Sequence, residues 1–408
     1  MKRFVILLLA VSIITVLAII VLVRATRSSV PPDPPVEDSQ AVLPSATLAT
    51  QPPTAAPTPT HEEDAPTPTP RLLSSQPTPS PTPVVDMEDL SLYQSALRPE
   101  FAADVEAASE ATRYFIQATL DPEDPTSLTG VERVRYTNTE TGPLDAIYFR
   151  LYPNLPGYGG SMTIDQVILN GALIEGTLEA GGSALRVPLD PPLAPGEVAD
   201  LTLWFQETLP IDTSAGYGLY GYSDDVYALA GFCPTIPVYD DEGWNVEVGP
   251  PYGDATFTDV AFYQVHLTVP DDLTVVTSGS RLETQDNEDG TQTWVAAGGP
   301  MRDFYAAMSA DYEVASDEVD GTRVNSYYRS TQPNGGELAL RYAADALRVF
   351  NERFGPYPYA ELDVVATPTN AGGIEYPGAI VVAQSLYDEE GGFFELATAH
   401  EVAHQWWY

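Results

Sequence analysis

The sequence predicts a mainly β amino-terminal sandwich domain followed by the start of an α+β domain, with an amino-terminal transmembrane helix and a disordered stalk in front. Three patterns support this prediction. An apolar run opens the chain, short alternating runs separated by turn residues begin near residue 113, and helices mix with strands beyond residue 310. We therefore expect four segments: an anchor at 1–29, a stalk at 30–88, a β-sandwich domain at 89–310 and an incomplete α+β domain at 311–408.

The first segment has the character of a membrane anchor. Phe4–Val23 is an almost unbroken apolar run, interrupted only by Ser12 and Thr15, and about 20 such residues span a bilayer as a helix. Val23-Arg24-Ala25 is a poor cleavage site for a signal peptidase. We therefore expect an uncleaved signal-anchor helix at 4–23 and a membrane as one partner of the chain.

The second segment has the composition of a stalk. Residues 30–85 are dominated by Pro, Thr, Ser and Ala, a composition that cannot bury a core and favours extended chain. Such a stalk holds a domain away from a surface, and an ordinary disordered linker is the alternative interpretation. Both interpretations make this a single-pass protein of the cell membrane whose folded part lies outside the cytoplasm.

Charge and cysteine content exclude some functions. The formal net charge is −40 and Lys2 is the only lysine, so the chain has few cationic side chains that could neutralise phosphates. We expect no nucleic-acid partner. Cys233 is the single cysteine, which rules out an intrachain disulfide. We expect it to be a small buried side chain rather than a link between two chains.

The third segment is predicted to begin with a helical stretch at Leu90–Ala111 and to continue as strands. Beyond residue 113, apolar and polar residues alternate as they do in half-buried strands. The runs of strand character are 131–136, 144–151, 164–169, 185–189, 198–206, 226–230, 260–269 and 292–296. Turn residues such as Asn170-Gly171 and Asp289-Gly290 separate them, so we expect an antiparallel β-sandwich.

The fourth segment mixes helices with strands. Gly336–Phe354 has a broad apolar face, and Gly355-Pro356 ends it as helices commonly end. Short apolar strands are expected at 362–366 and 378–383, followed by a second helix at Phe393–Tyr408. This pattern predicts an α+β domain.

The chemistry of the chain is concentrated in that last helix. In His400-Glu401-Val402-Ala403-His404 the spacing of four residues puts both imidazoles on one helical face, close enough to share a tetrahedral zinc ion. Glu401 projects beside them, where a carboxylate can act as the general base toward the attacking water. We therefore expect one zinc ion held by His400 and His404, with Glu401 as the catalytic residue.

A catalytic zinc site needs a third protein ligand, and the other histidines do not supply it. His61 belongs to the stalk, and His266 is expected at a half-buried strand position of the other domain. Position 407 is Trp407, where the metzincin pattern would have Gly. We expect the third ligand beyond Tyr408.

A second motif makes the pattern specific. Ala371-Gly372-Gly373-Ile374-Glu375-Tyr376-Pro377, together with the His400 motif, Trp406-Trp407 and the upstream Phe354–Tyr359 run, resembles the gluzincin aminopeptidases of the aminopeptidase N type. The family's first motif reads G-x-M-E-N and falls on Gly372–Tyr376. The strand-rich region also looks like the family's amino-terminal β domain, and the resemblance covers most of 113–408.

The resemblance implies roles for particular residues. Glu375 would bind the free α-amino group of a peptide substrate, and Gly372 and Gly373 would let the substrate backbone approach closely. It also implies a thermolysin-like catalytic domain, a third zinc ligand on a Glu about 18 residues after His404, and a tyrosine that stabilises the intermediate. Ile374 replaces Met and Tyr376 replaces Asn, and the second departure puts strict exopeptidase specificity in doubt.

Other interpretations stay open at this point. One is a zinc endopeptidase on the same scaffold, and another is a stalked β-sandwich binding protein whose peptidase domain is vestigial. A chain ending at Gln405–Tyr408 would leave an aromatic helix end without a partner, so we expect this sequence to be a fragment that is inactive alone.

Overall fold

The computed structural model describes residues 86–407 apart from 213, 250–255 and 389–390. The predicted anchor at 4–23 and the stalk up to residue 85 lie outside this part of the chain. Among the residues described, no helix is long and apolar enough to cross a membrane. Residues 86–88 already contact the β domain, because the guanidinium of Arg113 donates to the Met87 carbonyl and Glu88 pairs with Arg135.

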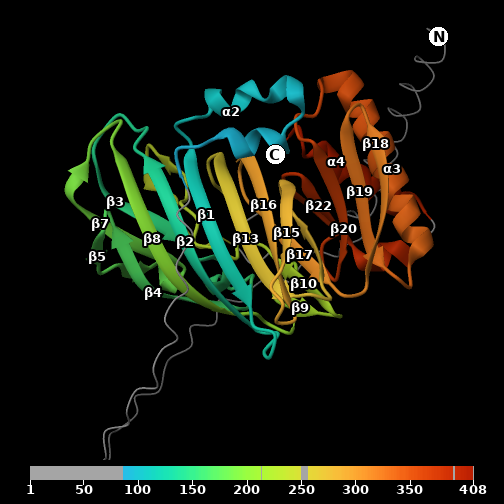
Figure 1. Cartoon of the computed structure of the whole chain (residues 1–408), viewed down its shortest axis with the longest axis horizontal. Helices are drawn as coiled ribbons and strands as arrows, with labels where there is room; N and C mark the ends of the chain where they lie inside the picture. The colour runs from blue at the N-terminus through green and yellow to red at the C-terminus, as the bar shows by residue number, and fades with distance from the viewer. Residues whose placement is uncertain (1–85, 213, 250–255, 389–390, 408) are drawn as a thin grey trace, which may run out of the picture. The chain divides into compact units, whose positions relative to one another are not determined.

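An eight-stranded sheet forms the main layer of the β domain (Figure 1). Its strands, in spatial order, are β15 (Ser280–Asp286), β16 (Thr291–Met301), β13 (Ala261–Pro270), β1 (Thr112–Leu120), β2 (Ser127–Thr137), β8 (Val198–Thr208), β4 (Ser161–Leu169) and β5 (Ala172–Ile174). β8 alternates buried and exposed residues along its length, as the sequence pattern predicts for a strand with one face on a core.

Smaller sheets complete the sandwich-like domain. They are the three-stranded sheet β3 (Leu144–Arg150), β7 (Ala184–Leu193) and β6 (Thr177–Glu179), the four-stranded sheet β14 (Thr274–Thr277), β17 (Ala306–Ser309), β10 (Val226–Leu229) and β9 (Tyr220–Ser223), and the hairpin β11 (Tyr239–Asp240) and β12 (Gly243–Trp244). One continuous core joins the buried side chains of these sheets to those of the main sheet. The expectation of a mainly β sandwich is therefore confirmed.

One strand pair departs from the antiparallel prediction. β1 and β13 pair in parallel, with Thr112 opposite Ala261 and Thr119 opposite Thr268. Most residues of both strands are buried and nearly all the others are half-buried, as in strands of parallel pairs. Alternation within each strand carries no information about the direction of its neighbour, so the sequence pattern did not reveal this pair.

The predicted helix at Leu90–Ala111 is wrong as a continuous element. The structure has three short pieces instead, the 3₁₀ turns η1 (Ser91–Ala96) and η2 (Pro99–Phe101) and the helix α2 (Ala103–Ala107). Pro99 cannot donate a backbone hydrogen bond, and Arg98 before it takes an extended conformation, so the helix breaks there.

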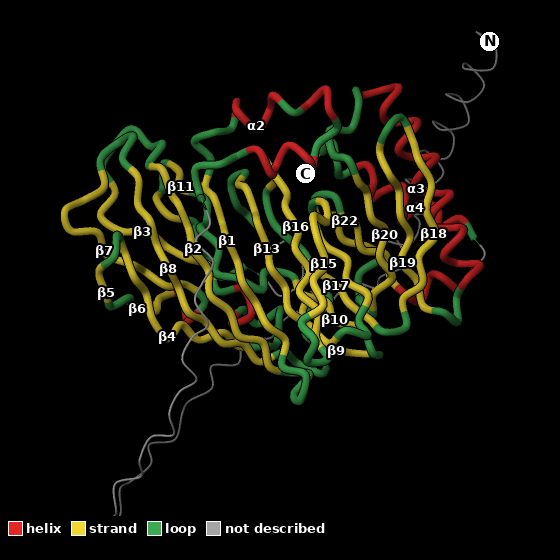
Figure 2. The backbone as a smooth tube through the Cα atoms, in the orientation of Figure 1, coloured by secondary structure: helices red, strands yellow, loops and turns green. Residues whose placement is uncertain are grey.

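The carboxyl-terminal segment is a mixed five-stranded sheet with helices on one face. The sheet order is β18 (Tyr312–Val319), β19 (Thr322–Arg329), β20 (Glu361–Thr367), β22 (Ala379–Ala383) and β21 (Gly373–Tyr376). The helices α3 (Pro333–Phe354) and α4 (Gly392–Ala403) pack together, and Figure 2 shows the longer helices gathered at this sheet.

The central strands β20 and β22 of this sheet are buried on both faces. Leu362 and Val364 of β20 belong to the core shared with α3 and α4, whereas Val365 belongs to the core of the β domain. β20 is therefore buried at every position from Leu362 to Thr367 rather than at alternate positions. The β domain consequently forms one wall for the sheet that carries the acidic motif of residues 371–377.

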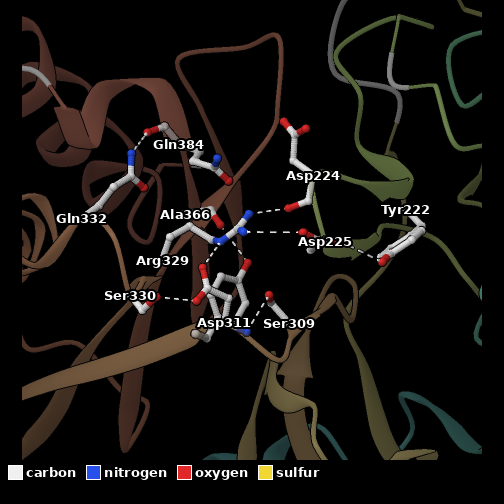
Figure 3. A network of polar contacts seen from close by, with 11 residues as sticks. Tyr222, Asp224, Asp225, Ser309, Asp311, Arg329, Ser330, Gln332, Ala366 and Gln384 are labelled. Carbon is white, nitrogen blue, oxygen red and sulfur yellow. Dashed lines mark hydrogen bonds and ion pairs between the residues drawn. The ribbon is translucent and has the colours of Figure 1, made fainter.

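Arg329, at the end of β19, connects the β domain to the mixed sheet through polar contacts (Figure 3). Its Nε donates to Oδ2 of Asp311 at 2.6 Å, and its guanidinium also donates to the backbone carbonyl of Asp224 in the β9–β10 turn. Asp225 of the same turn lies 3.8 Å from the guanidinium. One side chain thus joins a loop of the β domain to the first hairpin of the mixed sheet.

Candidate metal centre

The helix α4 positions the histidine motif. His400 and Glu401 lie in its last turn, and His404 caps its end with helical backbone angles (φ −62°, ψ −17°). The helix therefore ends at Ala403 and not at residue 408 as predicted. The cause is a tightening of the chain, since Gln405 and Trp406 donate to carbonyls three residues back.

The two imidazoles meet at the positions that a metal would need. Nε2 of His400 lies 3.2 Å from Nε2 of His404. Two ligand nitrogens at about 2.0–2.1 Å from a tetrahedral zinc ion would be about 3.3 Å apart. Nδ1 of His404 is 2.7 Å from the Trp407 carbonyl, to which it donates, so its Nε2 keeps a lone pair. The residues present therefore fit zinc.

Glu401 is buried beside this pair. Its side chain is only 4% exposed, and its Oε2 has no hydrogen-bond partner among the residues described. Burial, and then the nearby Glu375 carboxylate, raises the pKa of Glu401 to about 8. A buried carboxyl group without a partner is costly unless a cation or a proton accompanies it. This orphaned oxygen is a second observation that fits a metal.

Gly373 creates the space for Glu401. A Cβ atom at Gly373 would lie 2.4 Å from both Cγ and Oε1 of Glu401, closer than any real contact. The absence of a side chain at Gly373 thus leaves room for the Glu401 carboxylate. The family resemblance implied a different role for this glycine, the close approach of the substrate backbone. At Gly372 the nearest atom to such a Cβ belongs to the Phe393 ring, at 3.5 Å.

Glu375 faces the same centre from the sheet. It lies on β21, an edge strand that pairs only with β22 in the described sheet. Oε1 of Glu375 is 3.8 Å from Nδ1 of His404, and ligand atoms of Glu375, Glu401 and His404 all lie within 4.8 Å of one another. The structure thus brings together four of the residues that the two motifs singled out.

These residues open into a cavity of about 450 Å³. Its walls come from the acidic motif, the histidine motif and the β domain, and the lining residues are Tyr217, Leu219, Thr256, Asn370, Ala371, Gly372, Gly373, Ile374, Glu375, Tyr376, His400, Glu401 and His404. The β-domain contribution was not predicted, because no motif marks Tyr217, Leu219 or Thr256. Backbone hydrogen bonding from Asn370 to the Tyr217 carbonyl holds that loop against the site at 2.8 Å.

Tyr376, which departs from the family pattern, is built into the core. Its ring stacks on Tyr305 with centroids 4.2 Å apart and planes 1° apart, and the residue is 5% exposed. Its carbonyl accepts from Nε2 of Gln405 at 3.2 Å, while Oε1 of Gln405 accepts from the backbone N–H of Gly378. This glutamine ties the acidic motif to the histidine motif.

The aromatic end of the chain does have a partner, contrary to expectation. Nε1 of Trp406 donates to the Gly355 carbonyl at 3.0 Å, and its ring packs on Phe350 and Tyr357. Trp407 packs edge-on against Phe354. The Phe354–Tyr359 run is thus a docking surface for the end of α4.

Two other sequence expectations concern residues away from this centre. His266 lies on β13 with its ring edge-on to Phe115, and burial lowers its pKa. Cys233 is buried in the β domain, as expected. His61 falls outside the described residues.

Comparisons with known proteins agree with the fold and the motifs. No family model matches the chain. It is 35% identical over 106 residues to Aminopeptidase M1-B of Oryza sativa subsp. japonica, which covers 24% of this chain and 12% of that protein. It is 25% identical over 251 residues to Aminopeptidase 2 of Candida albicans, which covers 56% of this chain and 25% of that protein.

Among solved structures, the M1 zinc metallopeptidase from Deinococcus radiodurans superposes with a TM-score of 0.53 at 20% identity. That match covers 72% of this chain and 64% of the other. The chain therefore spans a quarter or less of the two curated relatives and just under two thirds of this structure. The sequence motifs, the fold and these relatives agree, and together they support an aminopeptidase N-type gluzincin family for this chain.

Proposed function

We propose that this chain carries the zinc-dependent chemistry that removes amino-terminal residues from peptides. The observation that carries the proposal is the 3.2 Å approach of the two Nε2 atoms beside the buried Glu401 carboxyl group. A zinc ion bound there would supply Lewis acidity toward a peptide carbonyl and lower the pKa of a water molecule.

The chain's own residues would do the remaining work. Glu375 would accept hydrogen bonds from the substrate's terminal ammonium group. This contact would place the peptide bond after the first residue at the metal centre. Glu401 would take a proton from the attacking water and pass it to the departing amine. The cavity of about 450 Å³ gives room for the terminal residue of a peptide.

The proposal requires a third protein ligand for zinc. We place it on a Glu that follows α4 beyond Tyr408, as the family resemblance implies. With two imidazoles the chain of 408 residues should bind zinc weakly and be inactive alone. Strong chelator-sensitive peptidase activity from residues 89–408 would contradict this expectation.

The test compares free and amino-acetylated forms of one short peptide as substrates of a protein that contains this chain together with the third zinc ligand. Hydrolysis should require the free amine and stop with a zinc chelator, and Glu401→Gln should lower kcat by at least ~1,000-fold while leaving zinc content unchanged. Glu375→Gln should mainly raise KM for the free peptide. Equal cleavage of both peptides would identify an endopeptidase instead. No metal-dependent hydrolysis at all would favour a binding protein.

We also propose that residues 4–23 anchor the protein in the cell membrane with the folded part outside the cytoplasm. The support is the length and apolar character of that run. Membrane fractions should retain the protein through alkaline carbonate washing, and protease added to spheroplasts or whole cells should digest it. Release of the protein by carbonate would overturn the proposal.

A further inference from the structure

A second cavity, of about 300 Å³, lies in the β domain, and its described lining residues are all different from those of the metal centre. It is bordered by the segment after α2, the end of β2, the first residues of β1 and β13, and the β11–β12 hairpin. Nothing in the proposed peptidase chemistry uses it. A cavity of this size is at the lower end of those that hold small molecules.

Aromatic rings form its walls. Trp244 lies opposite Tyr239 in the hairpin, with centroids 5.1 Å apart and planes at 72°. Tyr136, from β2, lies 6.2 Å from Trp244 with an interplanar angle of 51°. These are tilted and edge-to-face contacts between neighbouring rings, and Tyr148 also packs on Trp244, with centroids 6.0 Å apart. The rings therefore form one aromatic cluster that borders the cavity.

Carboxylates surround these rings, and no Arg or Lys of the described part of the chain lines the cavity. The acidic lining residues are Glu110, Glu140 and Asp259. None of the ion pairs found among the described residues involves them. Glu140 and Asp259 also act on one of the rings: burial is the main cause that raises the pKa of Tyr136, and these two carboxylates raise it further.

We infer that this cavity binds an organic ammonium cation with methylated nitrogen, of the choline type. The faces of Tyr136, Tyr239 and Trp244 attract such a cation through their quadrupoles while the methyl groups bury apolar area. Glu140 and Asp259 supply the balancing charge. The high acidity of the whole chain explains carboxylates anywhere on its surface, but it does not explain three aromatic rings around one cavity.

The test measures calorimetric binding of choline to the full chain, against its neutral carbon analogue 3,3-dimethyl-1-butanol. Choline should bind at least ~10-fold more tightly, because the analogue has the same shape without the charge. Trp244→Ala should lower the affinity for choline by at least ~10-fold, and Trp244→Phe by less. Trp294→Ala, which changes a tryptophan outside the cavity, is the matched control.

Charge is tested separately, on residues whose replacement spares the core. The double variant Glu140→Gln, Asp259→Asn should weaken choline binding ~3- to 10-fold, whereas Asp317→Asn, Glu318→Gln on β18 should not change it. Co-sedimentation with phosphatidylcholine vesicles, compared between the wild type and Trp244→Ala because residues 4–23 would bind vesicles in both, distinguishes a lipid headgroup from a free solute as the source of the cation. Equal binding of the neutral analogue, or unchanged choline binding in all cavity variants, would overturn the inference.

Discussion

At the scale of single residues, Gly373 is the position with the least freedom in the metal centre. A methyl group there would overlap Cγ and Oε1 of Glu401 at 2.4 Å. Gly373→Ala should therefore displace the carboxylate and lower kcat/KM by ~10- to 100-fold with a smaller effect on stability. Steady-state kinetics and thermal unfolding would check this. Gly142→Ala, where a new methyl group meets no described atom within 4 Å, should leave both unchanged.

Glu132 gives a prediction about pH. It is completely buried on β2 beside the Cys233 thiol, and neither of its carboxyl oxygens accepts a hydrogen bond from a described nitrogen or oxygen atom. Burial raises its pKa well above the usual value. The folded state therefore holds a proton that the unfolded chain releases above about pH 4.3. The free energy of unfolding should fall as pH rises from there toward the folded-state pKa, by at most about 1.4 kcal/mol per pH unit for this group.

Urea unfolding at pH 5 and pH 8 measures that dependence. Glu132→Gln should reduce the loss of stability between the two pH values, whereas Glu318→Gln, an exposed residue, should not. Identical pH dependence in the wild type and in Glu132→Gln would show that Glu132 ionises in the folded state as easily as in the unfolded one.

Sequence alone predicted which residues of the site come together along the helix but not what surrounds them. The spacing of His400 and His404 is fixed by helical periodicity, so their approach was predictable. The contact of Gly373 with Glu401 and the loop at Tyr217 depend on chain segments that meet only in the folded state. Local pattern contains no information about those contacts.

At the scale of elements, α4 depends on its aromatic end more than on its own sequence. It has no side-chain cap at its start, and Trp406 fixes its other end on Phe350, Gly355 and Tyr357. Trp406→Ala should lower the free energy of unfolding by about 2–4 kcal/mol and speed amide hydrogen exchange along α4. Trp406→Phe should retain most of the packing, and Phe393→Ala, whose side chain is 58% exposed, is the control.

The individual elements were predictable where periodicity was strong. α3 and the strands that were expected fall close to their predicted positions, because alternation and the apolar helix face reflect burial directly. Other strands, among them β1, β18 and β19, had no expected range. The prediction of one helix at 90–111 was wrong. The apolar spacing of this segment fits a helix, but Pro99 and the contacts of η1 with β16 impose short turns. β21 was missed as a strand because it has only four residues and begins with Gly373, which has no side chain to contribute to an alternating pattern.

At the scale of the molecule, Arg329 is the test of how firmly the β domain and the mixed sheet are joined. Arg329→Ala would remove the donor to Oδ2 of Asp311 and to the Asp224 carbonyl, so the free energy of unfolding should fall by about 1–3 kcal/mol. Urea unfolding checks this, with Arg348→Ala as the control, since its pair with Asp345 is exposed and should contribute less than about 0.5 kcal/mol. Two separate unfolding transitions in Arg329→Ala would show that the junction alone couples the two parts.

The parallel pairing of β1 with β13 has a consequence for the order of events during synthesis. β1 leaves the ribosome long before its neighbour Ala261–Pro270 exists, and β13 in turn carries β16 and β15. The centre of the main sheet must therefore wait for most of the chain, and until then β1 presents an unpaired edge to other nascent chains. Ribosome-bound chains that end before Ala261 should be digested rapidly by protease, and chains that include Met301 should resist it.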